Sequence, residues 1–209
     1  MPRTHVVDHP LVRHKLSILR DRNTPHGEFR RLAREITLLA AYEATADLPT
    51  VPIEVETPVA TAQADHLKAP EPAVVAILRA GLIMVDAVLE LMPHAAVGHL
   101  GMYRDPETKA PVDYYAKLPE HIDERAVLVV DPMLATGGSA VHSLDRLAEA
   151  GATDVRLLCI VGSPEGVEAV HSAHPDVPVF LAALDEGLNE NAYIVPGLGD
   201  AGDRIFGTL

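Results

Sequence analysis

Short runs made mostly of apolar residues constrain the fold of this chain more than any other feature of its sequence. They recur at residues 74–78, 95–100, 126–130, 155–161 and 179–184. Runs of this length suit strands, and a strand without regular alternation of polar residues is buried on both faces. Helix-like segments separate most of the runs, which is the order of a parallel sheet. The sequence therefore predicts an α/β fold with a central parallel sheet flanked by helices.

Helices are predicted where apolar residues recur every three or four positions. The first such stripe lies in an N-terminal helical region of about residues 10–45 and comprises Phe29, Leu32, Ile36 and Leu39. Further helices are expected at residues 82–91, 140–150 and about 165–173. Gly151 follows the second of these and suits a helix C-terminus, because glycine readily takes the left-handed conformation found there.

Two segments interrupt this alternation. The Pro-rich residues 48–58 end the helical region, and residues 53–61 alternate like short strands. Residues 101–121 form an irregular arm without helical periodicity, which holds three of the five tyrosines. The arm has two interpretations, a β-hairpin used in contacts between subunits and a lid over an active site, and both can hold. Because no repeat or linker is evident, one domain is expected over residues 1–209.

Charge and composition limit the classes of function. The formal net charge of −13 argues against nucleic acid or an anionic membrane as the main partner, since both are usually met by a basic surface. No segment approaches the roughly 18 apolar residues of a membrane span, and no apolar segment follows the N-terminus, so a cytoplasmic protein is expected. The single cysteine, Cys159, lies within an apolar run and is expected in the core.

The most informative segment follows the run at residues 126–130. Asp131 comes at the predicted carboxyl end of that strand, where open α/β sheets bind ligands. The adjacent glycines Gly137 and Gly138 allow a close backbone approach, and the N–H groups that open the next helix suit a phosphate. The alternative is an ordinary strand-to-helix turn with Ser139 as the N-cap. A Walker loop is excluded, because no Gly-Lys-Ser or Gly-Lys-Thr is present there.

Residues 129–139 (VVDPMLATGGS) resemble the PRPP-binding loop of type I phosphoribosyltransferases, in the form found in uracil phosphoribosyltransferases. Pro132 stands where many members of the superfamily have a second acidic residue, which leaves Asp131 as the principal acid. Other segments resemble the same family: residues 8–16 (DHPLVRHKL), 42–45 (YEAT), 78–81 (LRAG), 101–104 (GMYR) and 187–190 (GLNE). The resemblance extends nearly from end to end of the chain.

The resemblance implies a type I phosphoribosyltransferase fold with a β-arm and a C-terminal hood, about residues 187–209, over the base site. It implies transfer of the phosphoribosyl group of PRPP to uracil, giving UMP and pyrophosphate, with Asp131 as the catalytic residue. Mg2+ would be carried mainly by PRPP, without a dedicated protein site. The residues implied for PRPP are Arg79, Arg104, Asp131, Pro132, Met133, Leu134, Ala135, Thr136, Gly137, Gly138, Ser139 and Asp200; those for uracil are Ile194, Gly199, Asp200 and Ala201.

The two arginines have simpler alternatives. Arg79 follows an apolar run, and by resemblance it binds pyrophosphate oxygens, for which a planar guanidinium is suited. Without the resemblance it would be interpreted as a surface arginine in a loop. Arg104 resembles the second PRPP-contacting arginine of the family, but an exposed Arg-Asp-Pro turn would also explain it.

Two other patterns are misleading. Residues 197–202 match the dinucleotide motif GxGxxG, but only residues 203–209 follow, too few for the helix and strand that the motif requires. The eleven histidines include no HExxH motif and no Cys/His cluster, so solvated or capping roles are expected for them rather than a zinc site.

Competing functions remain at this point. An RNA-binding pyrimidine regulator on the same fold is the main alternative, and the acidic net charge counts against it. A transferase for another base is the second, and a nicotinamide-linked dehydrogenase is remote. The expected partners are uracil and PRPP, with no nucleic acid and no membrane. A homodimer or higher homo-oligomer is expected, with GTP as a candidate activator, as in some relatives.

Overall fold

The computed structural model describes residues 4–104 and 111–208, and residues 1–3, 105–110 and 209 lie outside this description. The helices are α1 (Pro10–Arg20), α2 (His26–Ala44), α3 (Leu82–Leu91), the 3-10 turn η1 (Ile122–Glu124), α4 (Gly138–Glu149), α5 (Pro164–Ala173) and α6 (Ala201–Phe206). The strands are β1 (Thr4–Val6), β2 (Thr50–Glu56), β3 (Thr61–Leu67), β4 (Ala73–Leu78), β5 (Ala96–Arg104), β6 (Pro111–Lys117), β7 (Ala126–Val130), β8 (Met133–Leu134), β9 (Asp154–Gly162), β10 (Val179–Leu184), β11 (Gly187–Leu188) and β12 (Ile194–Val195).

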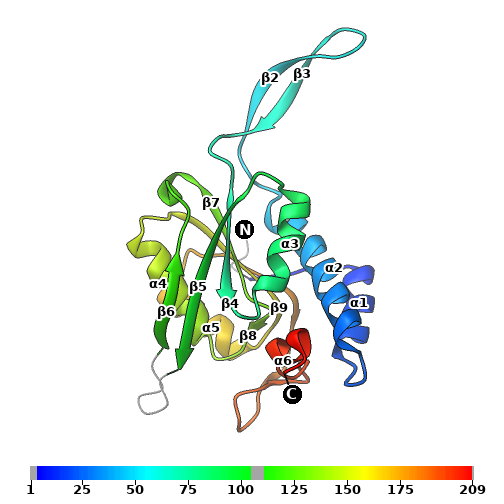
Figure 1. Ribbon diagram of the computed structural model, residues 1–209, viewed down its shortest axis with the longest axis vertical. Coiled ribbons are helices and arrows are strands. Elements are labelled where there is room, and N and C mark those ends of the chain that lie inside the picture. Colours follow the sequence, from blue (N-terminus) through cyan, green and yellow to red (C-terminus); the bar gives the residue numbers. More distant parts are fainter. Residues whose placement is uncertain (1–3, 105–110, 209) are drawn as a thin grey trace.

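The main sheet has the order β1-β10-β9-β7-β4-β5-β6, with β8 paired to β9 (Figure 1). Its pairs are parallel except β5 with β6, which is antiparallel. The apolar runs of the sequence correspond to β4, β5, β7, β9 and β10. The prediction of a mostly parallel sheet flanked by helices is therefore confirmed.

Each central strand sends alternate side chains to opposite faces of the sheet, as strand geometry requires. In β7, Leu128 and Val130 join the core beneath α1, α2, α3 and α6, while Val127 and Val129 join the core beneath α4 and α5. Cys159 is fully buried in the second core, as its sequence context predicts. Burial of both faces explains why the central strands are almost entirely apolar.

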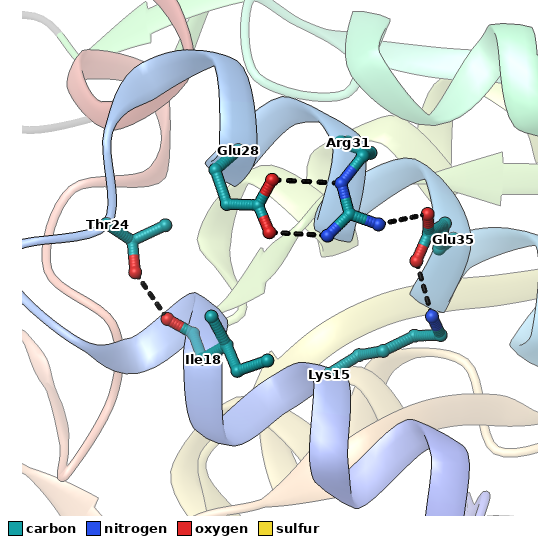
Figure 2. A network of polar contacts seen from close by, with 6 residues as sticks. All are labelled: Lys15, Ile18, Thr24, Glu28, Arg31 and Glu35. Carbon is teal, nitrogen blue, oxygen red and sulfur yellow. Dashed lines mark hydrogen bonds and ion pairs between the residues drawn. The ribbon is translucent and has the colours of Figure 1, made fainter.

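Polar contacts brace the hairpin of α1 and α2 on its outer side (Figure 2). Thr24 Oγ1 donates to the carbonyl of Ile18 at 2.5 Å, which fixes the turn between the helices. The Glu35 carboxylate forms ion pairs with Lys15 of α1 and with Arg31, which lies one turn earlier in α2. The hydrogen bond from Lys15 is the main reason that the pKa of Glu35 is lowered. These contacts are partly exposed, so each adds only modestly to stability.

The most prominent projection is a hairpin that sequence reasoning located poorly. Strands β2 and β3 pair antiparallel from Thr50↔Leu67 to Glu56↔Thr61 and extend well away from the body (Figure 1). The short strands expected at residues 53–61 fall instead on the end of β2, the turn and the first residue of β3. Thr57 makes that turn, because its Oγ1 accepts from the N–H groups of Val59 and Ala60 at 3.2 and 3.1 Å.

Of the two interpretations of residues 101–121, the β-hairpin is confirmed, and the segment is more regular than expected. Strand β5 continues through Arg104, and β6 runs back beside it as the edge strand of the main sheet. The register shifts between Gly101 and Met102, so the hairpin contains a bulge. A mixed polar and aromatic sequence suits an edge strand, which explains why no buried-strand pattern marks it.

Helices elsewhere begin and end close to their predicted bounds. Residues 82–91 form α3 as expected, and Gly151 takes a left-handed φ of 89° after α4. Helix α1 is capped by His9, whose Nδ1 accepts from the N–H of Leu11 at 3.1 Å. Within residues 4–104 and 111–208, no helix is both long and apolar enough to cross a membrane.

Candidate active site

A cleft of about 330 Å³ opens at the carboxyl ends of β4 and β7, between the main sheet and the C-terminal segment. This is the position at which open α/β sheets bind ligands. Several elements distant in the sequence contribute to its walls, which are Arg79, Ala80, Asp131, Met133, Ala135, Ala192, Tyr193, Ile194, Gly199, Asp200, Ala201 and Gly202. The structure thus brings together Arg79, Asp131 and the four residues predicted to contact uracil.

A smaller hollow of about 80 Å³ adjoins the cleft. It is formed by the phosphate loop, which we define as residues 131–139, together with Ala140. The cleft and the hollow share Asp131, Met133 and Ala135. A ligand with a phosphate at one end could therefore occupy both.

The phosphate loop enters α4 through Gly137. This residue has a φ of 80°, and a Cβ placed on it would lie 2.7 Å from Cβ of Ala169 in α5. Only glycine satisfies both conditions without strain. The helix begins at Gly138, so Ser139 lies inside its first turn and the alternative of Ser139 as an N-cap is wrong. The early start directs the first helical N–H groups at the hollow.

The first half of the phosphate loop is fixed by contacts behind it. The carbonyl of Pro132 accepts from the N–H groups of Ile160 and Val161 at 3.1 Å. Ser163, which is fully buried, donates from Oγ to the carbonyl of Ala135 at 2.6 Å, and its N–H donates to the carbonyl of Leu134 at 2.9 Å. Pro132 and the Leu134 side chain are buried, so these two residues shape the loop rather than face a ligand with their side chains.

Asp131 lies where β7 ends. Its N–H donates to the carbonyl of Leu158 at 3.2 Å, and its Oδ1 receives a long contact of 3.5 Å from the N–H of Met133. Burial of the carboxyl raises the pKa of Asp131 to about 7, against the lowering effect of the Met133 N–H. A carboxyl in this state is costly to ionise, and a cation nearby would favour its charged form.

Of the two arginines predicted to bind PRPP, the structure describes the side chain of Arg79 but not that of Arg104. Arg79 follows β4 directly, is exposed, and places its guanidinium carbon 5.5 Å from the centre of the Phe206 ring. It therefore lies in the cleft wall between the sheet and the C-terminal segment. Arg104 ends β5, and its side chain lies outside the described residues, so its role stays a prediction.

The hood, which the structure describes over residues 187–208, closes the other side of the cleft. Its strands β11 and β12 pair antiparallel, and Ile194 is buried while Gly199 and Asp200 are exposed. Asp200 is the N-cap of α6, since its Oδ1 accepts from the N–H of Asp203 at 2.9 Å. Its carboxylate therefore has a structural task as well as a place in the cleft.

Sequence reasoning missed part of the cleft wall. Asn189 organises the turn before β12, because its Oδ1 accepts from the N–H groups of Asn191 and Tyr193 at 3.0 Å. Ala192 in this turn has a φ of 61°. The asparagine is the one signal in the sequence that could have located the turn, since its side chain commonly bonds to nearby backbone.

Metal-binding side chains do not gather into a cage in the part of the chain that the structure describes, where no group of three or more His, Cys, Asp or Glu residues could hold an ion. The anionic side chains that line the cleft are Asp131 and Asp200.

Comparison with known proteins gives a consistent result. The family model described as uracil phosphoribosyltransferase matches residues 6–208. A uracil phosphoribosyltransferase of Symbiobacterium thermophilum is 59% identical over 208 residues, covering 100% of both chains. One of a Thermoanaerobacter species is 57% identical over 203 residues, covering 97% of both.

Solved structures agree with the fold. The AQ2163 protein of Aquifex aeolicus superposes with a TM-score of 0.92 at 34% identity, covering 97% of both chains. The adenine phosphoribosyltransferase of Trypanosoma brucei gives a TM-score of 0.55 at 13% identity, covering 96% of this chain and 89% of that one, which bears on the fold alone.

Replacing Gly137 tests the location of the phosphate site. Gly137→Ala places a Cβ at a positive φ and against α5, so the loop must shift. We expect KM for PRPP to rise roughly tenfold or more, equivalent to about 1.4 kcal/mol of binding. Gly27→Ala is the matched control, because a Cβ there meets nothing within 4 Å, and its KM should not change. An unchanged KM in Gly137→Ala would place the phosphate elsewhere.

The Asp131→Asn variant tests the electrostatic environment of Asp131. Because burial raises the pKa of Asp131 to about 7, above its unfolded value, ionisation opposes folding increasingly as pH rises from about 4 to about 7. An amide does not ionise. We expect the Tm of the variant, without PRPP or Mg2+, to exceed that of the wild type by roughly 5 °C at pH 8 and to converge with it near pH 4. Calorimetry across this range that shows no pH-dependent gap would refute the assigned environment.

Proposed function

The chain belongs to the uracil phosphoribosyltransferase family, and we propose that the cleft between the phosphate loop and the hood is where its reaction takes place. The protein is a pentosyltransferase that joins uracil to the 5-phosphoribosyl group of PRPP, giving UMP and pyrophosphate. The observation that carries the placement is the continuity of the cleft with the loop hollow through Asp131, Met133 and Ala135. A base, a ribose and a phosphate would then lie in line along one surface.

PRPP would bind with its 5′-phosphate in the loop hollow. The glycine-lined entry to α4 and the hydroxyl groups of Thr136 and Ser139 provide hydrogen-bond donors for it. Arg79 would bind the pyrophosphate, because it is the arginine in the cleft wall and a guanidinium matches paired phosphoryl oxygens. Arg104, at the end of β5, would contact PRPP as a second cation.

Asp131 would stabilise the reacting ribose. The bond between C1′ and the pyrophosphate oxygen breaks as the bond from uracil N1 to C1′ forms, and positive charge develops on the ribose ring. The N1 proton of uracil would leave to the departing pyrophosphate or to water. A carboxylate at the strand end would hold the ribose hydroxyls and stabilise that charge. The poorly solvated surroundings that raise the pKa of Asp131 also strengthen its attraction to a cation.

Mg2+ fits the donor set of this cleft. The oxygen atoms of Asp131 and Asp200 are the kind of ligand that Mg2+ prefers, and their small number fits an ion that PRPP carries. We propose that the Asp200 carboxylate, alongside its capping role, faces the magnesium–PRPP complex. When bound, the ion would supply neutralisation of charge on the leaving pyrophosphate.

Uracil would be recognised by main-chain groups of the hood. The pairing edge of uracil presents O2 as acceptor, N3–H as donor and O4 as acceptor, while cytosine replaces the last two with an acceptor and an amino donor. Ile194 is buried, and the residues beyond it in the cleft wall, such as Gly199 and Ala201, carry small side chains without polar groups. Backbone groups are therefore the better candidates for reading the base, and mismatched pairs there would strongly disfavour cytosine.

The proposal extends to the assembly and regulation of the enzyme. The exposed hairpin β2–β3 presents Val51, Val55 and Val59 to solvent, which supports assembly into a homodimer or a higher homo-oligomer. GTP as an activator stays a prediction.

The two cores share one sheet, which supports a single domain over residues 1–209. Because PRPP is a charged intracellular metabolite, we propose that the enzyme works in the cytoplasm, with no nucleic acid as partner.

Two substitutions of Ala201 test recognition by the backbone. Ala201→Pro deletes an N–H, whereas Ala201→Ser keeps the backbone and serves as the matched control. We expect the preference for uracil over cytosine in kcat/KM, on the order of 10⁴-fold in the wild type, to fall in the proline variant and to change little in the serine variant. Equal use of the two bases by the unmodified enzyme, or full selectivity in Ala201→Pro, would contradict the assignment.

A further inference from the structure

One segment of the hood, residues 196–200, borders two hollows. Residues 199 and 200 line the active-site cleft, and they also line a second hollow of about 440 Å³. That second hollow is bounded by Arg20, Arg22 and Arg204 together with residues 196–200. Leu198 is buried in the core, but Gly199 and Asp200 are exposed and gain little from apolar packing, so polar contacts along the segment are needed to set their position.

Arg20, the last residue of α1, binds this loop through a buried carboxylate. Its two terminal nitrogens contact the two oxygens of Asp185 at 2.7 and 2.6 Å, a bidentate pair. The Asp185 side chain is only 5% exposed and that of Arg20 21%. A pair this well aligned and this well buried has a defined geometry, unlike a surface ion pair.

Both partners of the pair also hold the main chain of Gly197. Arg20 donates to the Gly197 carbonyl at 2.7 Å, and Asp185 accepts from the Gly197 N–H at 2.9 Å. The turn at this residue is tight, with a φ of 61°, and a Cβ added to it would lie 2.1 Å from the carbonyl oxygen of Ile194. The ion pair therefore fixes both the N–H and the carbonyl of Gly197, which lies between Ile194 and Gly199 in the hood.

A second arginine holds the next carbonyl of the loop. Arg204 in α6 donates to the carbonyl of Leu198 at 2.8 Å and to that of Asp21 at 2.5 Å. Its guanidinium lies 4.5 Å from the centre of the Phe29 ring in α2. The loop is thus tied to the N-terminal helices, and the contacts in Figure 2 brace those helices against each other.

We propose that Arg20 and Asp185, supported by Arg204, are positioning residues that set the main-chain groups of the hood for uracil. This inference rests on the proposed function, in which residues 194–201 contact the base. Because the carbonyls of Gly197 and Leu198 are held by the arginines on one side, the loop is fixed with its following residues, Gly199 and Asp200, in the cleft wall. None of the three side chains is assigned a contact with substrate.

The test compares Arg20→Lys with a matched control. Lysine keeps the charge but cannot span both Asp185 oxygens and the Gly197 carbonyl with a planar group. We expect KM for uracil to rise about tenfold and selectivity against cytosine to fall, with KM for PRPP within about twofold of wild type. Arg156→Lys is the control, because the Arg156 side chain is even more buried than that of Arg20, at 8% exposed, and bonds to Asp47, Asp154 and the Ala44 carbonyl near the start of β9, away from the cleft.

The control separates positioning from stability. Both variants should lose thermal stability, but Arg156→Lys should keep the wild-type KM for uracil. Asp185→Asn is the second variant, in case Arg20→Lys fails to fold, and it should show the same selective effect. An Arg20→Lys or Asp185→Asn enzyme that folds and keeps the wild-type KM and selectivity for uracil overturns the inference.

The same measurements distinguish this inference from the proposal beneath it. If Ala201→Pro alters base selectivity but the Arg20 and Asp185 variants do not, the hood reads uracil without their help. If none of these variants alters it, uracil binds elsewhere and the proposed function fails. Guanidinium ion added to Arg20→Ala should restore part of the affinity for uracil, which a merely destabilised enzyme would not show.

Discussion

The burial of the parallel strands on both faces is the constraint on which the rest of the molecule depends. Because α1, α2, α3 and α6 cover one face and α4 and α5 the other, the strands offer no exposed face for a ligand. What remains accessible is the edge formed by the strand ends. Asp131 after β7 and Arg79 after β4 meet there because these two strands are neighbours in the sheet. The geometry of the cleft is thus a consequence of strand order rather than of any local motif.

The charge that the proposed reaction needs in the cleft lowers the stability of the folded protein. Burial makes the ionised form of Asp131 unfavourable, yet that form is the one that would stabilise a positively charged ribose. The hood shows the same conflict in its backbone, since it uses a left-handed glycine and a segment that borders two hollows. Such features persist only where surrounding contacts hold them, as the Arg20–Asp185 pair does for Gly197.

Much of the fold could be predicted because its determinants are local. Apolar runs identify buried strands, and the spacing of Phe29, Leu32 and Ile36 identifies the stripe that α2 buries. The hairpin β2–β3 escaped the same reasoning because both of its faces are largely exposed and no apolar pattern marks it. The pairing of Arg20 with Asp185 could not be predicted at all, since 165 residues separate the two and only the packing of α1 against the sheet brings them together. The phosphate loop could be located from Asp131 at a strand end and the glycines that follow it, and its resemblance to a family supported the assignment. The turn at Asn189 was missed because hydrogen bonds over a few residues leave little trace in composition.

The central claim is that Asp131 acts on the reacting ribose within this cleft, and the single-turnover rate of UMP formation tests it most directly. With PRPP, Mg2+ and uracil at saturating concentrations, Asp131→Asn should fold, bind PRPP and form UMP on the order of 100-fold more slowly, a loss of about 3 kcal/mol of transition-state stabilisation. A folded Asp131→Asn enzyme that forms UMP at the wild-type rate would contradict the account.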